Sequence, residues 1–296
     1  MMELQTTVDI PKGKFSIGHD DRIMLLGSCF ADEIGGKLIQ YGFRSLVNPF
    51  GTIYNPASLA AILLRCISLT PYSPTSRELF CDSDGVWHSW MHHSRFSSQE
   101  QAELIAALND KTNEASEFLK SADVLIVTLG TAIIYRLKES GLLVSNCHKQ
   151  PDAMFRRERL TVYDIVDQWR MLLPLLRSVN PRLKVIFTVS PIRHKRDGMH
   201  INQISKGILL QAVDELLTVA GEDGNSYFPS YELMMDELRD YRFYANDMIH
   251  PSPVAVEYIW QRFQDTYMTP ATRQAGLAAL KEWKRSQHRE IIGAKD

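Results

Sequence analysis

The stretch that decides the fold is residues 123–130, which read Asp-Val-Leu-Ile-Val-Thr-Leu-Gly. Its apolar run is continuous, as expected of a central strand whose two faces are both covered by helices. Shorter apolar runs that stop at turn-forming residues occur over residues 22–26, 43–47, 183–189 and 226–229. Between these runs, apolar residues recur at helical spacing. Strands that alternate with helices in this way predict an α/β fold with a mainly parallel, five-stranded, doubly wound sheet.

The connections between the strands divide into helices and two irregular excursions. Apolar spacing predicts a first helix that ends near residue 42, and further helices over about 57–67, 98–120, 161–179, 204–219, 254–268 and 270–287. Residues 68–98 are rich in proline and serine and are interpreted as an insertion that can hold a small hairpin. A second hairpin is expected around Glu139-Ser140-Gly141. We therefore predict a single α/β domain over residues 1–296, with a C-terminal helical extension at about 270–290.

The composition is that of an ordinary globular protein with little net charge. Apolar residues make up 45% of the 296 residues, charged residues make up 23%, and the formal net charge is −2. The most basic stretch, Arg156 to Arg159, is interrupted by Glu158 and is interpreted as a solvated approach to a helix. No nucleic-acid partner and no anionic membrane surface are therefore expected.

Cysteine usage and the absence of targeting segments lead us to expect a cytoplasmic location. The four cysteines are scattered and form no Cys-x-x-Cys pair, which favours reduced thiols over a zinc site or a disulfide framework. The N-terminus has no basic stretch followed by an apolar one, so no signal peptide is predicted. No window contains the roughly 18 consecutive apolar residues that a membrane span needs.

Candidate catalytic residues lie where the predicted strands end, because ligands of parallel sheets bind beyond the carboxyl ends of the strands. Ser28 follows a buried strand and precedes a helix, whose first amides could hold a developing oxyanion. A serine needs a base to become a useful nucleophile. Asp247 and His250 are three positions apart, so in a helical turn they would be offset by only about 4.5 Å and could converge on one site. Pro251 follows, and Ser252 resembles the N-cap of the next helix.

Simpler interpretations exist for each of these residues. Ser28 could be only a helix N-cap, and Asp247 with His250 could be only a surface pair. Cys29 is the rival nucleophile, but adjacent residues in such a turn point in different directions, and Cys29 is interpreted as a small buried apolar residue. The shared position of both fragments at one edge of the sheet favours a Ser28–His250–Asp247 triad.

No metal and no other cofactor are expected. His88 and His92 are four positions apart, but no third ligand stands at a recognised spacing. The aromatic residues Trp87, Trp90 and Phe96 could form a lid over the site, and we interpret them as a local core.

Residues Gly27-Ser28-Cys29-Phe30-Ala31 resemble the signature of the GSCFA family, which is related to the SGNH or GDSL serine hydrolases. Four further blocks are similar to that family: residues 48–56, 146–151, 190–194 and 247–250. The resemblance covers residues 20–265 and implies a flavodoxin-like three-layer α/β/α sandwich. It also implies Ser28 as nucleophile, His250 as base and Asp247 as the acid that orients the base.

One departure from the SGNH pattern concerns the oxyanion hole. SGNH hydrolases resemble one another in using the serine amide, a glycine amide and the side chain of an asparagine in a Gly-x-Asn block. Ser28 and Gly51 would supply the first two donors here, but Ala132 stands at the asparagine position. Thr131, Asn146 or His148 could replace this donor. Losing one donor typically costs about 2–4 kcal/mol of transition-state stabilisation.

Three functions follow as hypotheses. The first is a serine esterase that acts on a small-molecule or glycan ester, with an O-acetylated carbohydrate as the substrate that the family resemblance favours. The second is an O-acyltransferase to a sugar hydroxyl, and the third is a non-catalytic binding module, which Ala132 keeps open. Arg193 and Lys149 could hold an anionic group of the substrate or simply be solvated. The sequence leaves the oligomeric state open.

Overall fold

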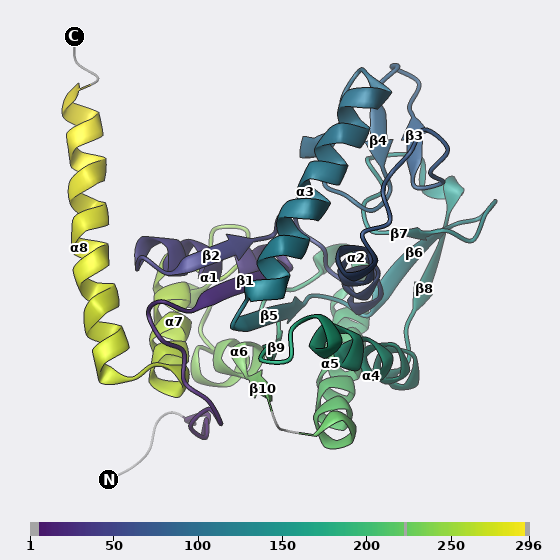
Figure 1. Ribbon diagram of the computed structural model, residues 1–296. Helices are drawn as coiled ribbons and strands as arrows, with labels where there is room; N and C mark the ends of the chain where they lie inside the picture. The colour runs from purple at the N-terminus through teal and green to yellow at the C-terminus, as the bar shows by residue number, and fades with distance from the viewer. Residues whose placement is uncertain (1–5, 222–223, 294–296) are drawn as a thin grey trace.

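A parallel five-stranded sheet forms the centre of the computed structural model, which describes residues 6–221 and 224–293 (Figure 1). Its strand order is β10-β9-β5-β1-β2, and every neighbouring pair is parallel. Counted along the chain this is the order 2-1-3-4-5, the flavodoxin-like doubly wound topology, so the expected fold class is confirmed. The strands are β1 (Arg22–Gly27), β2 (Arg44–Val47), β5 (Val124–Leu129), β9 (Lys184–Val189) and β10 (Asn225–Phe228).

Helices cover both faces of this sheet and make three layers. Alternate residues of β1 point to opposite faces, so that Ile23 and Leu25 belong to one core cluster while Met24 and Leu26 belong to the other. The first cluster is closed by α1 (Cys29–Gln40) and α7 (Pro253–Tyr267). The second cluster is closed by α2 (Pro56–Ser68), α3 (Gln101–Ser121), α4 (Val162–Val179) and α5 (Met199–Ala220).

Capping residues fix where most of these helices begin. Four of them accept a hydrogen bond from an amide in the first turn: Ser28 for α1, Asn55 for α2, Thr161 for α4 and Ser252 for α7. Proline occupies the first position of α2 and α7, where its missing N–H costs no hydrogen bond. Because Ser252 ends the preceding loop sharply, the segment that contains His250 stays outside the helix, as expected.

Two small antiparallel sheets lie outside the central one. The insertion holds a hairpin of β3 (Leu79–Cys81) and β4 (Trp87–Ser89), as its composition allows. The aromatic residues of this insertion pack as expected, but in two small cores rather than one. Trp87 and Phe96 pack in one cluster, and Trp90 belongs to another, where it stacks on Phe80 with ring centroids 3.6 Å apart.

The second small sheet includes a strand that the sequence did not predict. Its order is β7-β6-β8, with β6 (Ile133–Leu137) and β7 (Leu143–Val144) forming the expected hairpin and β8 (Phe155–Arg159) pairing with β6. The interpretation of Arg156 to Arg159 as an approach to a helix is therefore wrong. Their charges do face solvent, but on the exposed edge of a sheet, where Arg156 pairs with Glu158.

The remaining elements connect β10 to the C-terminal helices. They are α6 (Ser230–Glu232), the π-helical turn η4 (Leu233–Glu237) and the 3₁₀ turn η5 (Tyr241–Phe243). Three short 3₁₀ turns lie earlier in the chain: η1 (Ser94–Phe96), η2 (Asp152–Met154) and η3 (Lys195–Asp197). Helix α8 (Pro270–Gly293) runs along one side of the molecule next to α7 (Figure 1). Among the described residues, no helix has both the length and the apolar character to cross a membrane. Residues 1–5, which bear on the signal-peptide prediction, lie outside the described part.

Candidate active site

The turn between β1 and α1 places Ser28 and Cys29 at the carboxyl edge of the sheet. Gly27 ends β1 with a φ of +146°, and a Cβ there would lie 2.2 Å from the carbonyl oxygen of Thr128. Only glycine therefore allows β1 and β5 to approach so closely at this point. The Ser28 amide donates to the same Thr128 oxygen at 3.2 Å and continues the strand pairing by one residue.

Ser28 is buried and caps α1. Its backbone is extended (φ −69°, ψ 174°), and its Oγ accepts a hydrogen bond from the Phe30 amide at 3.4 Å. Only 1% of Ser28 is exposed, and the residue does not line the cleft into which His250 projects. The helix-capping alternative therefore describes what the Ser28 side chain does in this structure.

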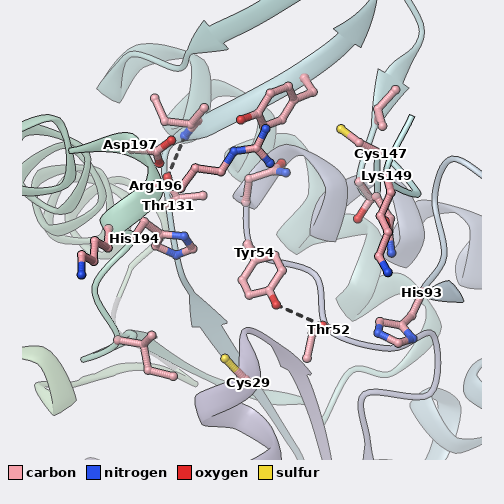
Figure 2. A pocket seen from close by; sticks show the side chains of 18 of the residues that line it. Cys29, Thr52, Tyr54, His93, Thr131, Cys147, Lys149, His194, Arg196 and Asp197 are labelled. Atoms are coloured by element: carbon pink, nitrogen blue, oxygen red, sulfur yellow. Dashed lines mark hydrogen bonds between the residues drawn. The ribbon is translucent and has the colours of Figure 1, made fainter. Parts of the chain in front are cut away.

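Cys29, the first residue of α1, faces the cleft instead. Its Sγ lies 3.6 Å from His250 Nε2, and the half-buried side chain points into the cleft (Figure 2). The structure thus reverses the orientation that we expected for Ser28 and Cys29. The physical reason is the cap: an N-cap side chain folds back onto the amides of the first helical turn, and the next side chain is left to face the rim.

The candidate base stands in a tight loop between η5 and α7. Asp247 Oδ1 accepts hydrogen bonds from the amides of Ile249 at 2.9 Å and His250 at 3.0 Å, and Oδ2 lies 2.5 Å from His250 Nδ1. Met248 has a φ of 59°, in the left-handed region that non-glycine residues rarely adopt. The Ala245 amide closes the loop on the His250 carbonyl at 2.8 Å. The Asp247–His250 segment therefore forms a tight loop and not the turn of a helix. This loop still brings the carboxylate and the imidazole together, as expected.

Hydrogen bonding and burial set the protonation states of this group. Hydrogen bonds from the His250 amide, then the His250 ring and the Ile249 amide, lower the pKa of Asp247 to about 2. An ionised carboxylate at Nδ1 favours the tautomer that leaves Nε2 free to accept a proton. Burial raises the pKa of the Cys29 thiol, so the thiol is protonated at neutral pH. Its conversion to a nucleophile therefore depends on His250.

The thiol and the imidazole open into a cleft of about 850 Å³. Its walls include the loop after β7, with Cys147 and Lys149, and the loop after β9, with His194, Arg196 and Asp197 (Figure 2). The charged residues of the lining are Lys149, Arg193, Lys195, Arg196, Asp152 and Asp197. More of these are basic than acidic, so the lining is polar with a positive excess.

Of the expected oxyanion donors, Gly51 and Thr131 use their groups elsewhere. Gly51 has a φ of +84°, and its amide donates to the Asn48 carbonyl at 2.8 Å rather than into the cleft. Thr131 lines the cleft, but its amide donates to the Tyr54 carbonyl at 3.0 Å. The Thr131 hydroxyl lies 3.0 Å from Ser205 Oγ and accepts a hydrogen bond from the Ile133 amide. Neither residue therefore offers a free backbone amide, and the Thr131 hydroxyl is held by Ser205 and the Ile133 amide.

The other three expected site residues also line the cleft. Asn146 Oδ1 accepts a hydrogen bond from the His148 amide at 2.9 Å. The ring nitrogens of His148 lie 2.8 Å from the Ser89 carbonyl oxygen and 3.4 Å from Ser94 Oγ, so this ring is held on the wall. Arg193 donates to the Met248 carbonyl, and its contact supports the loop that carries His250.

Sequence reasoning missed a buried lysine beneath the site. Lys206 of α5 is 1% exposed, and its Nζ donates to the carbonyls of Gly130 at 2.7 Å and Ser190 at 2.6 Å, just beyond β5 and β9. Burial lowers the pKa of Lys206 to about 7. The sequence does contain a signal for this burial. Asn202 and Lys206 are one helical turn apart on the same face of α5 as the buried Leu209.

Tyr54 was also missed, although it stands in the centre of the cleft (Figure 2). The sequence offers only its place in the Asn48–Pro56 loop as a signal, because a tyrosine between turn-forming residues is not by itself a catalytic pattern.

Comparison with known proteins supports one family. The sequence model of the GSCFA family matches residues 22–263. No curated protein matches the chain in sequence. Among solved structures, a carbohydrate esterase family 3 from Talaromyces cellulolyticus is 10% identical, with 83% of this chain and 95% of that chain covered and a TM-score of 0.38.

Two further solved structures have similar values. A carbohydrate esterase family 2 enzyme with a carbohydrate binding domain, from Corynascus thermopiles (Myceliophthora fergusii), is 12% identical, with 93% and 69% covered and a TM-score of 0.42. A putative GDSL-like lipase from Parabacteroides merdae is 13% identical, with 86% and 98% covered and a TM-score of 0.38.

Proposed function

The chain belongs to the GSCFA family, and from this premise we propose that it is an ester hydrolase that forms an acyl-thioester on Cys29. The observation that carries the proposal is that the Cys29, His250 and Asp247 side chains contact one another in that order at the rim of the sheet. Cys29 Sγ is 3.6 Å from His250 Nε2, and His250 Nδ1 is 2.5 Å from Asp247 Oδ2. A nucleophile, a base and a group that orients the base are what nucleophilic acyl transfer requires.

The reaction follows from these contacts in two steps. Cys29 Sγ forms a bond to the ester carbonyl carbon while its proton moves to His250 Nε2. The bond between the carbonyl carbon and the alcohol oxygen of the ester then breaks, and the leaving alcohol takes the proton from His250. Water attacks the acyl-thioester with His250 as base, which releases a carboxylic acid and restores the thiol. Asp247 stays ionised and stabilises the imidazolium in both steps.

An O-acetylated carbohydrate is the substrate class that we propose. The cleft is open and wide enough for a sugar residue beyond the thiol. Its lining combines hydrogen-bonding side chains, such as those of Thr52, Asn146 and Gln150, with the aromatic ring of Tyr135. Hydroxyl-rich ligands need many convergent donors and acceptors, and this lining offers them.

The test compares two adjacent residues. Wild-type protein incubated with p-nitrophenyl acetate should release p-nitrophenol and carry one acetyl group by intact mass spectrometry. Cys29→Ala should abolish both signals. Ser28→Ala is the matched control and should keep both, although loss of the N-cap is expected to lower stability by about 1 kcal/mol. The opposite pattern would return the nucleophile to Ser28, and no adduct in any protein would leave the binding module as the explanation.

Transfer of the acyl group to a sugar hydroxyl is the second candidate, favoured by the size of the cleft. A volume of about 850 Å³ exceeds what an acetyl group and a water molecule occupy and leaves space for an acceptor. The two reactions share the acyl-thioester and differ only in what resolves it. Adding methyl glycosides during p-nitrophenyl acetate turnover distinguishes them: a transferase produces acetylated glycoside, whereas a hydrolase produces acetate at an unchanged rate.

A further inference from the structure

Attack by Cys29 would create an oxyanion for which the expected third donor is absent. Ala132, at the asparagine position of the Gly-x-Asn block, is fully buried and has no polar side chain. The amides of Gly130 and Thr131 in the same block both donate to the carbonyl oxygen of Tyr54, at 2.7 and 3.0 Å. The amides of Gly130 and Thr131 are therefore not free to bind an oxyanion, and they hold the backbone of Tyr54 in place.

The ring of Tyr54 is held as well as its backbone. It packs edge-on against the His194 ring, with centroids 5.6 Å apart and an interplanar angle of 89°. Burial, and then the nearby Lys206, lowers the pKa of His194 to about 4, so this neighbour is neutral. The ring position places the Tyr54 hydroxyl at the end of the cleft where Cys29 and Thr52 lie (Figure 2).

The Tyr54 hydroxyl lies within hydrogen-bonding range of the Cys29 side chain, beside the sulfur that would attack the substrate. Thr52 Oγ1 donates to the Tyr54 oxygen at 3.4 Å, so in this contact the phenol accepts. Burial, followed by smaller contributions that include the Cys29 thiol, raises the pKa of Tyr54. The phenol is therefore a neutral donor at physiological pH, which is the state that an oxyanion needs.

We propose that the Tyr54 hydroxyl is a catalytic residue that donates a hydrogen bond to the oxyanion formed when Cys29 attacks an acyl carbonyl. This inference rests on the proposed function. When the S–C bond forms, the carbonyl π electrons move to oxygen, and the thiol proton moves to His250. Tyr54 keeps its proton and stabilises the negative oxygen, together with the amide of Cys29 at the first helical position of α1.

The experiment removes one oxygen atom and keeps the ring. Tyr54→Phe should lower kcat for p-nitrophenyl acetate by about 10²–10³-fold with little change in KM, as expected when one oxyanion donor is lost. Alkylation of Cys29 by iodoacetamide creates no oxyanion, so its rate should change by less than tenfold, which reflects only the lost contact between Tyr54 and the sulfur. Tyr231→Phe is the control, because it removes a buried hydroxyl outside the cleft, and it should leave kcat unchanged.

A reversible inhibitor separates failure of this inference from failure of the proposed function. A phenyl trifluoromethyl ketone should form a hemithioketal with Cys29, and Tyr54→Phe should bind it about 10²–10³-fold more weakly. If wild-type protein shows neither turnover nor hemithioketal, the proposed function is wrong and the role of Tyr54 falls with it. If wild-type protein shows both and Tyr54→Phe matches it, only the role of Tyr54 is wrong. If iodoacetamide alkylation falls as much as kcat, Tyr54 acts on the thiol instead, and the inference is overturned.

Discussion

Replacement of the buried Lys206 by methionine should make the stability of the protein respond differently to pH. Lys206 is fully enclosed, and burial lowers its pKa from 10.5 to about 7. That difference means that folding disfavours the charged form of Lys206, relative to the neutral form, by about 5 kcal/mol. Because the side chain is shielded from water, solvent does not screen this effect. In the neutral form, Nζ can still donate to the carbonyls of Gly130 and Ser190.

The sign follows from proton binding. Between about pH 7 and 10.5 the unfolded chain keeps the proton of Lys206 and the folded protein releases it, so the unfolded state binds more protons. Stability therefore rises with pH across this window in the wild-type protein, and a methionine at position 206 removes the contribution. The free energy of unfolding of wild type, relative to Lys206→Met, should increase by about 2 kcal/mol between pH 7 and pH 9.

Urea unfolding at several pH values measures this difference. Both proteins should carry Cys29→Ala, because interaction with the Cys29 thiol raises the pKa of Lys206 and would otherwise change with the substitution. Equal m-values in the two proteins would show that the same surface is exposed on unfolding. Only the change of this stability difference with pH is compared, so the overall effect of Lys206→Met on stability does not affect the test. A difference that stays constant, or that shrinks as the pH rises, would refute the assignment of a buried lysine with a strongly lowered pKa.

Three further predictions concern the active site and its support. Asp247→Asn should lower kcat for p-nitrophenyl acetate by about 10⁴-fold, because in such triads the amide stabilises the wrong tautomer of the imidazole. A loss of less than tenfold would contradict the triad. Because burial raises the pKa of Cys29, its alkylation rate should climb with a midpoint above pH 9.0; a plateau below pH 7 would instead indicate a thiolate–imidazolium pair. Arg262→Met should destabilise the fold by about 1.5–3 kcal/mol in urea unfolding, because the buried Glu237 carboxylate loses its charged hydrogen-bond donor and keeps those of the Val8 amide and the Tyr258 hydroxyl. An unchanged midpoint would argue against that cost.

Most of the sheet could be predicted because burial on both faces leaves a simple pattern. The continuous apolar run from Val124 to Leu129 is fully buried in β5, as are nearly all of the residues in β1 and β9. β8 escaped because an exposed edge strand needs no apolar side chains, and its sequence Phe-Arg-Arg-Glu-Arg carries neither alternation nor turn signals. Pairing with β6 creates this strand, and that information lies elsewhere in the chain.

The site was predicted in part for a similar reason. Asp247 and His250 are close in sequence, so their contact depends on local geometry and could be expected from spacing alone. Which of Ser28 and Cys29 faces His250 depends instead on the path of the chain at the start of α1. Both residues fit the turn by composition, and the capping bond from the Phe30 amide selects between them.

Residues with left-handed backbone are concentrated in the loops around the cleft. Among the described residues, five non-glycine residues have a positive φ, and four of these stand in loops around the cleft: Asn48, His148, Lys149 and Met248. These four residues belong to three loops, and a side-chain hydrogen bond holds each loop. Asn48 accepts from the Gly27 amide and donates to Asp32, Asn146 accepts from the amide of His148, and Asp247 accepts from the two amides after Met248. Left-handed residues cost stability and persist only where their surroundings fix them. Their concentration at one rim is an independent physical reason to place the function there, and it does not depend on which residue attacks.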